Sequence, residues 1–273
     1  QLNRMTGDYV LSGAKALKAG VDISLWDISF SKLEEALEKG LINMEDLDKS
    51  VLRVLERKFE QGLFENPYLP ENEDFIKYNY ENYDQSLQLA KQSVVLLKNE
   101  NNILPLKTNK KLKIAIIGPN GNDIYNQLGD YSPYIKENEG TTILKGINDF
   151  IKNNNLDIEV NYLKGCAILD KNTENIKESV ELAKNSDLVI LALGGSSSRF
   201  GEVTFDSNGA AIANSKVAMD CGEGMDCASL DLPGKQNELA SEIFKVCNNV
   251  IAIIIGGRPY AISNISENSN ALL

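Results

Sequence analysis

The alternation of short apolar runs with helical patterns constrains the fold of this chain more than any other sequence feature. Between residues 114 and 255, several apolar runs have the length of strands, and segments with apolar residues at helical spacing lie between them. The runs are residues 114–117, 158–163, 187–193 and 250–255, and the helical segments are residues 143–153, 176–185 and 235–247. Such alternation indicates a mostly parallel sheet with helices on both faces.

The first part of the chain has a different order of patterns. A helix over residues 9–18 precedes a short strand over 21–25, and a second helix, capped by Ser29 or Ser31, runs to Gly40. A longer helix begins after Asn43 and ends near Gly62. The end of a (β/α)₈ barrel has this order of elements, and one strand cannot close a sheet of its own.

These patterns predict an α/β chain of two parts. We expect residues 1–63 to be the C-terminal tail of a (β/α)₈ barrel domain and residues 85–273 to be a mostly parallel α/β-sandwich domain that is incomplete at its C-terminus. Residues 64–84 are polar and rich in tyrosine, which is typical of a linker that packs on a surface. We also expect both ends to be cut from a longer chain.

Charge and hydropathy exclude several classes of function. The 28 Lys and Arg residues are outnumbered by 39 Asp and Glu, and the formal net charge of −11 disfavours nucleic acid as a partner. No apolar run approaches the roughly 20 residues that a membrane-spanning helix needs. We expect a soluble protein, with a cytoplasmic location favoured over secretion, and a neutral sugar is compatible with its surface.

Histidine is absent from the chain, and this limits its chemistry. Ser-His-Asp and Cys-His catalysis and histidine-bound metals are excluded, so proton transfer falls to carboxyl, Tyr, Lys or Cys groups. We expect neither a metal nor a cofactor. Cys221 and Cys227 are close enough in sequence for a disulfide, but four cysteines in this length are more typical of packing thiols than of a disulfide framework.

One long segment is the main candidate for a functional loop. Residues 194–233 separate a strand from its helix, whereas such loops usually have about 2 to 6 residues. In an open parallel sheet, ligands bind beyond the carboxyl ends of the strands, where this segment starts. Glu223 stands between Gly222 and Gly224, which allow close approach of the backbone to a ligand. Other acidic side chains of the segment include Glu202, Asp206, Asp220 and Asp226, and a solvated acidic loop is the alternative interpretation.

Two other glycine-rich turns do not match known nucleotide or hydrolase motifs. Residues 118–122 fit neither GxGxxG nor GxxxxGK[ST], so a nucleotide-binding α/β domain has little support beyond the alternation of strands and helices. Residues 194–198 are not a GxSxG elbow, and no histidine could serve a serine there.

Several segments together resemble glycoside hydrolase family 3, in order and along nearly the whole chain. The strongest match is CGEGMD at residues 221–226 followed by LDLPGKQ at 230–236. The other matching segments are LKAGVD at 17–22, LRVL at 52–55, KFEQGLFENPY at 58–68, SVVLLKNE at 93–100, ILPL at 103–106, AIIGPN at 115–120, GDY at 129–131 and GRP at 257–259.

This resemblance implies roles for residues of the long loop. In the family, the second domain supplies the acid/base glutamate, which maps to Glu223, with Glu202 as the reserve candidate. Arg199 and Asp226 are the expected substrate-binding residues. An arginine often follows the aspartate that corresponds to Asp226, whereas this chain has Cys227, so the salt bridging of the loop departs from the family pattern.

The resemblance also implies a nucleophile that is not in this chain. The family's nucleophile is an aspartate on a barrel strand upstream of the segment that resembles residues 19–22. Asp8 is the only acid in residues 1–16 and is expected to begin a helix. The leading hypothesis is therefore part of an exo-acting retaining β-glycosidase that acts on β-glucosides or β-xylosides. Its partners would be a β-linked oligosaccharide or glycoside and the missing barrel portion, and a non-catalytic carbohydrate-binding or interaction module is the alternative.

Overall fold

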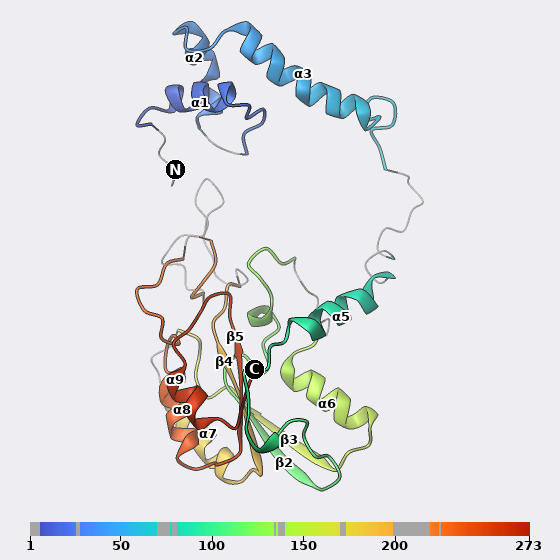
Figure 1. Ribbon diagram of the computed structural model, residues 1–273, viewed down its shortest axis with the longest axis vertical. Helices are drawn as coiled ribbons and strands as arrows, with labels where there is room; N and C mark the ends of the chain where they lie inside the picture. The colour runs from blue at the N-terminus through green and yellow to red at the C-terminus, as the bar shows by residue number, and fades with distance from the viewer. Residues whose placement is uncertain are drawn as a thin grey trace. The chain divides into compact units, whose positions relative to one another are not determined.

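The protein is described by a computed structural model that covers residues 6–25, 28–69, 77, 81–133, 135, 140–169, 173–198, 219–223 and 225–273. The chain forms two compact units, Gln1–Asp84 and Gln85–Leu273 (Figure 1). Each unit is described by itself.

The first unit contains α1 (Tyr9–Lys18), the short 3₁₀ helix η1 (Phe30–Lys32), α2 (Leu33–Glu38) and α3 (Met44–Glu60). The expected caps form at two of these helices. Asp8 caps α1, because its carboxylate accepts the backbone N–H of Val10 at 2.8 Å. Asn43 and Asp46 form a reciprocal capping box at the start of α3. The residue before α2 is Lys32, which makes no capping hydrogen bond, so the predicted serine cap of this helix is wrong.

Apolar side chains hold the helices of the first unit together. Val10, Ala14 and Leu17 on α1 pack with Ala36 and Ile42 in one buried cluster. At the end of α1, Asp22 and the α3 residue Arg53 form a two-point ion pair, with Nε to Oδ2 at 2.8 Å and Nη2 to Oδ1 at 2.6 Å. Hydrogen bonding by the Arg53 guanidinium lowers the pKa of the Asp22 carboxyl group.

The strand expected at residues 21–25 does not form. Strands exist only as hydrogen-bonded pairs, and the described part of the first unit contains no second strand that could pair with this segment. The sequence pattern alternates apolar and polar residues over the length of a short strand, but pairing depends on a neighbouring strand that local sequence does not supply.

The second unit is built on one six-stranded sheet. The strand order is β1-β6-β5-β4-β2-β3, and all neighbouring pairs are parallel except β1 with β6. This arrangement confirms the predicted mostly parallel sheet. The strands are β1 (Lys98–Asn99), β2 (Leu112–Ile117), β3 (Ile158–Leu163), β4 (Leu188–Gly194), β5 (Val250–Ile255) and β6 (Ala271–Leu272).

Alternating side chains of the strands supply two separate cores, one on each face of the sheet. On β2, Ala115 and Ile117 face the helices α7 (Glu174–Lys184), α8 (Gln236–Phe244) and α9 (Ser263–Asn268). Ile114 and Ile116 face the opposite way, toward α6 (Ile143–Asn153). The helices therefore form a layer on either side of the sheet, as Figure 1 shows. The remaining elements are α5 (Tyr83–Ser93) and the 3₁₀ helices η2 (Glu100–Asn102) and η3 (Tyr125–Gln127).

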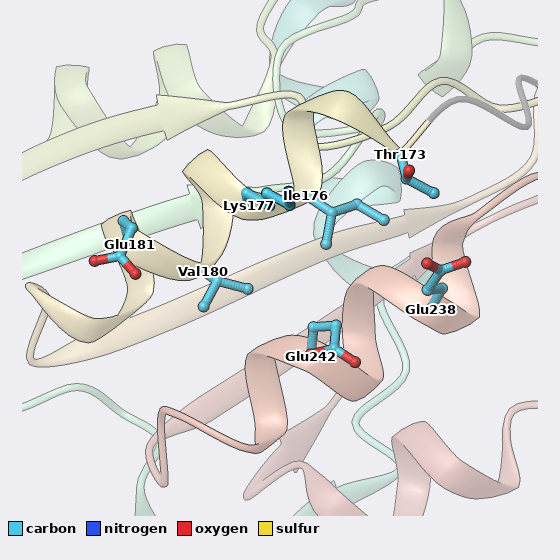
Figure 2. A pocket seen from close by; sticks show the side chains of 7 residues that line it. All are labelled: Thr173, Ile176, Lys177, Val180, Glu181, Glu238 and Glu242. Atoms are coloured by element: carbon cyan, nitrogen blue, oxygen red, sulfur yellow. The ribbon is translucent and has the colours of Figure 1, made fainter.

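The helices α7 and α8 lie side by side and leave a hollow of about 420 Å³ between them (Figure 2). Its floor includes the apolar side chains Ile176 and Val180. The carboxylates around it are paired with lysines three residues away, in the pairs Glu181–Lys184, Glu238–Lys235 and Glu242–Lys245.

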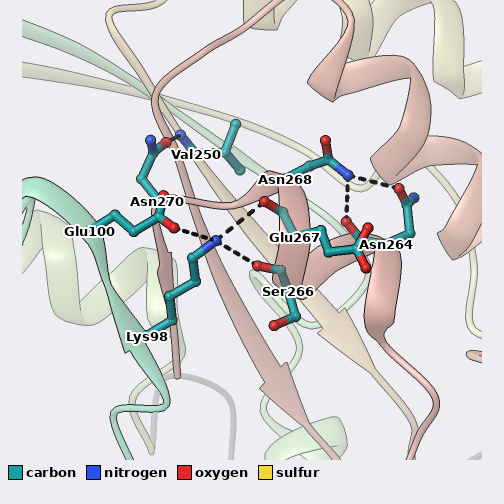
Figure 3. A network of polar contacts seen from close by, with 8 residues as sticks. All are labelled: Lys98, Glu100, Val250, Asn264, Ser266, Glu267, Asn268 and Asn270. Carbon is teal, nitrogen blue, oxygen red and sulfur yellow. Dashed lines mark hydrogen bonds and ion pairs between the residues drawn. The ribbon is translucent and has the colours of Figure 1, made fainter.

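The antiparallel edge of the sheet is fastened by a lysine (Figure 3). Lys98 on β1 donates from Nζ to the backbone carbonyls of Ser266, at 2.7 Å, and Glu267, at 3.2 Å, in the last turn of α9. A cation at a helix C-terminus is stabilised by the exposed carbonyls. The same ammonium lies 3.1 Å from the carboxylate of Glu100.

Strands of two residues such as β1 and β6 are too short to be predicted from periodicity.

Within the described residues, no helix combines the length and apolar character required to cross a lipid bilayer.

Candidate functional site

The candidate site lies at the carboxyl edge of the sheet, where β2, β4 and β5 end. The chain passes from β2 to β3 on one side and returns to β4 on the other, so β2 and β4 flank a switch point in the strand order. Ligands of open α/β sheets bind at such points. Residues 219–223 and 225–227, the returning segment, lie at this edge, and the backbone N–H of Asp220 donates to the carbonyl of Ser196, which follows β4.

Asn120 ties the ends of two strands together at the switch point. Its side chain is fully buried, and Nδ2 donates to the carbonyls of Leu193 at 3.1 Å, Gly195 at 3.4 Å and Ile255 at 3.4 Å. Because all three neighbours are carbonyl oxygens, which only accept, the amide atom that faces them must be the nitrogen. The amide oxygen, Oδ1, has no hydrogen-bond partner.

Asp220 is a buried carboxylate that anchors the returning segment. Its side chain is 3% exposed, Oδ1 accepts the N–H of Ser196 at 2.7 Å, and Oδ2 accepts the hydroxyl of Tyr260 at 2.7 Å. These contacts close over Gly195, where a Cβ atom would lie 2.0 Å from Tyr260 Oη and 2.1 Å from Asp220 Oδ1. The glycine is therefore required by the packing of the carboxylate.

Two ionisable side chains beside Asp220, those of Tyr260 and Cys221, stay in their neutral forms. Burial, followed by the hydrogen bond to Asp220, raises the pKa of the Tyr260 hydroxyl far above its usual range. Burial, followed by the charge of Asp220, raises the pKa of the Cys221 thiol. Tyr260 is thus held as a hydrogen-bond donor, and Cys221 is a packing thiol and not a reactive thiolate.

The backbone carbonyl of Asp220 is a second point at which the returning segment is held. It accepts the Cys227 thiol at 3.1 Å and the Arg258 guanidinium, through Nη1, at 3.3 Å. Cys227 belongs to the returning segment itself, whereas Arg258 follows β5. These contacts restrain the segment in the absence of an arginine at position 227.

Glu223 stands on the exposed tip of this restrained segment. The preceding Gly222 has a φ of +114°, a backbone conformation that residues other than glycine rarely adopt. The backbone N–H of Glu223 donates to Asp130 Oδ2 at 3.1 Å, and the hydroxyl of Tyr131 donates to Glu223 Oε2. The carboxylate is therefore presented at the surface but is held by contacts at both its backbone and its side chain.

The other predicted site residues divide into two groups. Asp226 lies within the described residues, where it is exposed three residues beyond Glu223. Arg199 and Glu202 lie outside the described residues. Sequence reasoning assigned no role to Asp130, Tyr131, Asp220 or Tyr260. Asp130 and Tyr131 were visible only as a family-like GDY segment, and nothing local links that segment to Glu223, more than 90 residues later.

Comparisons with known proteins support one family. Residues 94–273 match the model of the glycosyl hydrolase family 3 C-terminal domain. A beta-xylosidase of Formosa agariphila is 33% identical over 275 residues, which cover 94% of this chain and 34% of that protein. The periplasmic beta-glucosidase of Salmonella typhimurium is 27% identical over 285 residues, which cover 94% of this chain and 34% of that protein.

A solved structure agrees with the sequence relatives. The crystal structure of a beta-glucosidase from Listeria innocua in complex with isofagomine superposes with a TM-score of 0.76 at 25% identity and covers 98% of this chain. The chain spans 34% of the length of that protein, as it does for the two sequence relatives. Because the family model matches well over half of the residues, the chain belongs to glycosyl hydrolase family 3, through that family's C-terminal domain.

Proposed function

We propose that this chain is part of an exo-acting retaining β-glycosidase and that Glu223 is its general acid/base. The observation that carries the proposal is an exposed carboxylate on a glycine-flanked tip, which hydrogen bonds of Asp220 and of Glu223 itself anchor at the carboxyl edge of the sheet. The names of the relatives, beta-xylosidase and beta-glucosidase, favour β-xylosides or β-glucosides as substrates. A neutral glycoside is also compatible with the acidic chain.

The proposed chemistry is a double displacement. In the first step, Glu223 gives its proton to the glycosidic oxygen while a carboxylate nucleophile attacks the anomeric carbon, so that the glycosidic bond breaks and a glycosyl ester forms. In the second step, Glu223 acts as a base and removes a proton from water, which attacks the anomeric carbon and releases the nucleophile. The position of Glu223 on an exposed loop suits contact with a substrate held by another domain.

The domain division follows from the same proposal. We assign residues 1–63 to the tail of a (β/α)₈ barrel, residues 64–84 to a linker and residues 85–273 to the α/β-sandwich domain. An apolar stripe on α3 supports this assignment, because Val51, Leu52 and Phe59 are each more than half exposed. Such a stripe requires a packing partner, and further barrel helices and strands would supply one.

The nucleophile and most of the sugar-binding residues belong, in this proposal, to the rest of the barrel. Asp8 is the only acid in residues 1–16, and its carboxylate is occupied as the cap of α1. From the long loop, Arg199 and Asp226 are the proposed substrate-binding residues. Glu202 is the reserve candidate for the acid/base.

The chain by itself is expected to show no turnover of aryl β-glucosides or aryl β-xylosides. One carboxylate cannot perform both nucleophilic attack and proton transfer in a double displacement. The measurement is release of the aryl alcohol by the purified chain, compared with a longer protein that includes the barrel, for which proton NMR should show the β-anomer as the first product. Turnover by the chain that Asp8→Asn abolishes would contradict this expectation and would make Asp8 the nucleophile.

A further inference from the structure

A turn that follows β2 reaches the tip of the Glu223 segment. Gly129, Asp130 and Tyr131 lie between η3 and α6, and two of them bond to Glu223. This turn is separate from the Asp220 anchor, which uses residues that follow β4 and β5. The segment that carries Glu223 is therefore held at two places, by the Asp220 anchor and by this turn.

The first contact fixes the backbone of Glu223. Asp130 Oδ2 accepts the N–H of Glu223 at 3.1 Å. The same oxygen would lie 3.1 Å from a Cβ atom placed on Gly222, so the turn and the tip are packed closely. With Gly222 at φ of +114°, the backbone of the tip has a conformation that this hydrogen bond helps to select.

The second contact acts on the carboxylate. The Tyr131 hydroxyl donates to Glu223 Oε2, while the Tyr131 ring is 77% exposed. A donor to a carboxylate stabilises its ionised form and restricts its rotation. Because Asp130 and Tyr131 are adjacent in sequence, the two contacts hold the peptide group and the side chain of one residue at the same time.

We propose that Asp130 and Tyr131 are positioning residues that clamp Glu223, with Asp130 orienting its backbone and Tyr131 orienting its carboxylate. The proposal deepens the proposed function and rests on it for its catalytic meaning, but the clamp itself is a property of this chain. Tyr131 thereby supports the ionised state in which Glu223 acts as a base, and Asp130 keeps the tip in the geometry that both catalytic steps use.

Other titratable groups border the same tip and are left unchanged when the Tyr131 hydroxyl is removed. They are Asp130 on the turn, Asp220, Cys221, Asp226 and Cys227 on the returning segment, and Arg258 after β5. A change caused by removal of the Tyr131 hydroxyl alone is therefore assigned to that hydroxyl.

The carboxylate contact is tested by carbon-13 NMR titration of Glu223 in the complete chain. In Tyr131→Phe, the titration midpoint of Glu223 should move to higher pH, because the ionised form loses a hydrogen-bond donor. Tyr125→Phe is the matched control, since its hydroxyl lies nearby in the chain but bonds to the backbone of Ile135. A midpoint that does not move, that falls, or that moves equally in both variants would overturn the role of Tyr131.

The backbone contact is tested by hydrogen exchange of the Glu223 amide. Asp130→Ala should speed exchange about five- to tenfold, because the acceptor is lost, whereas Asp130→Asn retains an acceptor oxygen and should stay close to the original rate. Equal exchange in all three proteins would overturn the role of Asp130. Neither test requires activity, so failure of the clamp is distinguishable from failure of Glu223 as the acid/base.

Discussion

Replacement of Glu223 by alanine in the barrel-containing glycosidase is expected to lower kcat/KM for alkyl β-glycosides by about 10²- to 10⁴-fold, the usual contribution of general acid catalysis. For dinitrophenyl β-glycosides, kcat/KM should fall less than about tenfold, because this leaving group departs without protonation. The value of kcat should still fall, since hydrolysis of the glycosyl ester lacks its base. Steady-state and burst kinetics on matched alkyl and aryl substrates measure the difference.

Two variants on the same loop serve as controls for this expectation. Asp226→Ala removes a neighbouring exposed carboxylate and should lower kcat/KM for both substrate types in similar proportion. This is the pattern expected when a side chain binds the ground state and the transition state equally well. Glu202→Ala tests the reserve candidate. If Glu202→Ala shows the dependence on the leaving group and Glu223→Ala does not, the acid/base role belongs to Glu202.

The largest effect on stability is expected for Asn120→Asp. The Asn120 amide donates to three carbonyl oxygens from a fully buried position, and an ionised aspartate would direct an acceptor at the same oxygens. We expect the free energy of unfolding to fall by more than about 3 kcal/mol at pH 8. A protonated aspartate can donate one hydrogen bond, so the folded state favours the protonated form and part of the loss should be regained as the pH falls toward 5. Urea unfolding of the variant and the original protein at pH 5 and pH 8 measures the loss in the free energy of unfolding at each pH.

The controls separate buried charge from loss of the amide. Asn120→Ala removes the same hydrogen bonds without a titratable group, so its loss of stability should be equal at both pH values. Asn154→Asp makes the same chemical change at an exposed residue whose amide donates to Phe150, and should cost about 1 kcal/mol or less. An Asn120→Asp loss that is small, or that is the same at pH 5 and pH 8, would contradict the assigned role of the amide.

The elements of the second unit could be predicted because their local patterns agree with their tertiary surroundings. The helix α6 and the strands β3 and β5 have the bounds that periodicity indicated. In contrast, residues 21–25 alternate apolar and polar side chains as a strand does, but the described part of the first unit offers no strand to pair with them. The two-residue strands β1 and β6 exist only because they pair with each other and, for β6, also with β5. Strand identity in these cases depends on a partner far away in the sequence.

The candidate site was predicted only in part, for a related reason. Glu223 was found from its flanking glycines, the length of the loop and the family-like motif, all of which are local. The burial of Asp220 depends on Tyr260 and Ser196, and the clamp on Glu223 depends on Asp130 and Tyr131. Such contacts join the ends of different strands, so a single sequence contains no spacing rule that identifies them.

Chemical rescue tests the central claim most directly. In the barrel-containing enzyme with Glu223→Ala, azide should enter the space left by the carboxylate and attack the anomeric carbon of the glycosyl ester. The carbon–nitrogen bond forms as the ester bond breaks, and no base is required. We predict that azide raises kcat on a dinitrophenyl β-glycoside and that the product is the β-glycosyl azide. No rescue, or an α-glycosyl azide, would contradict the assignment of Glu223 as the acid/base of a retaining glycosidase.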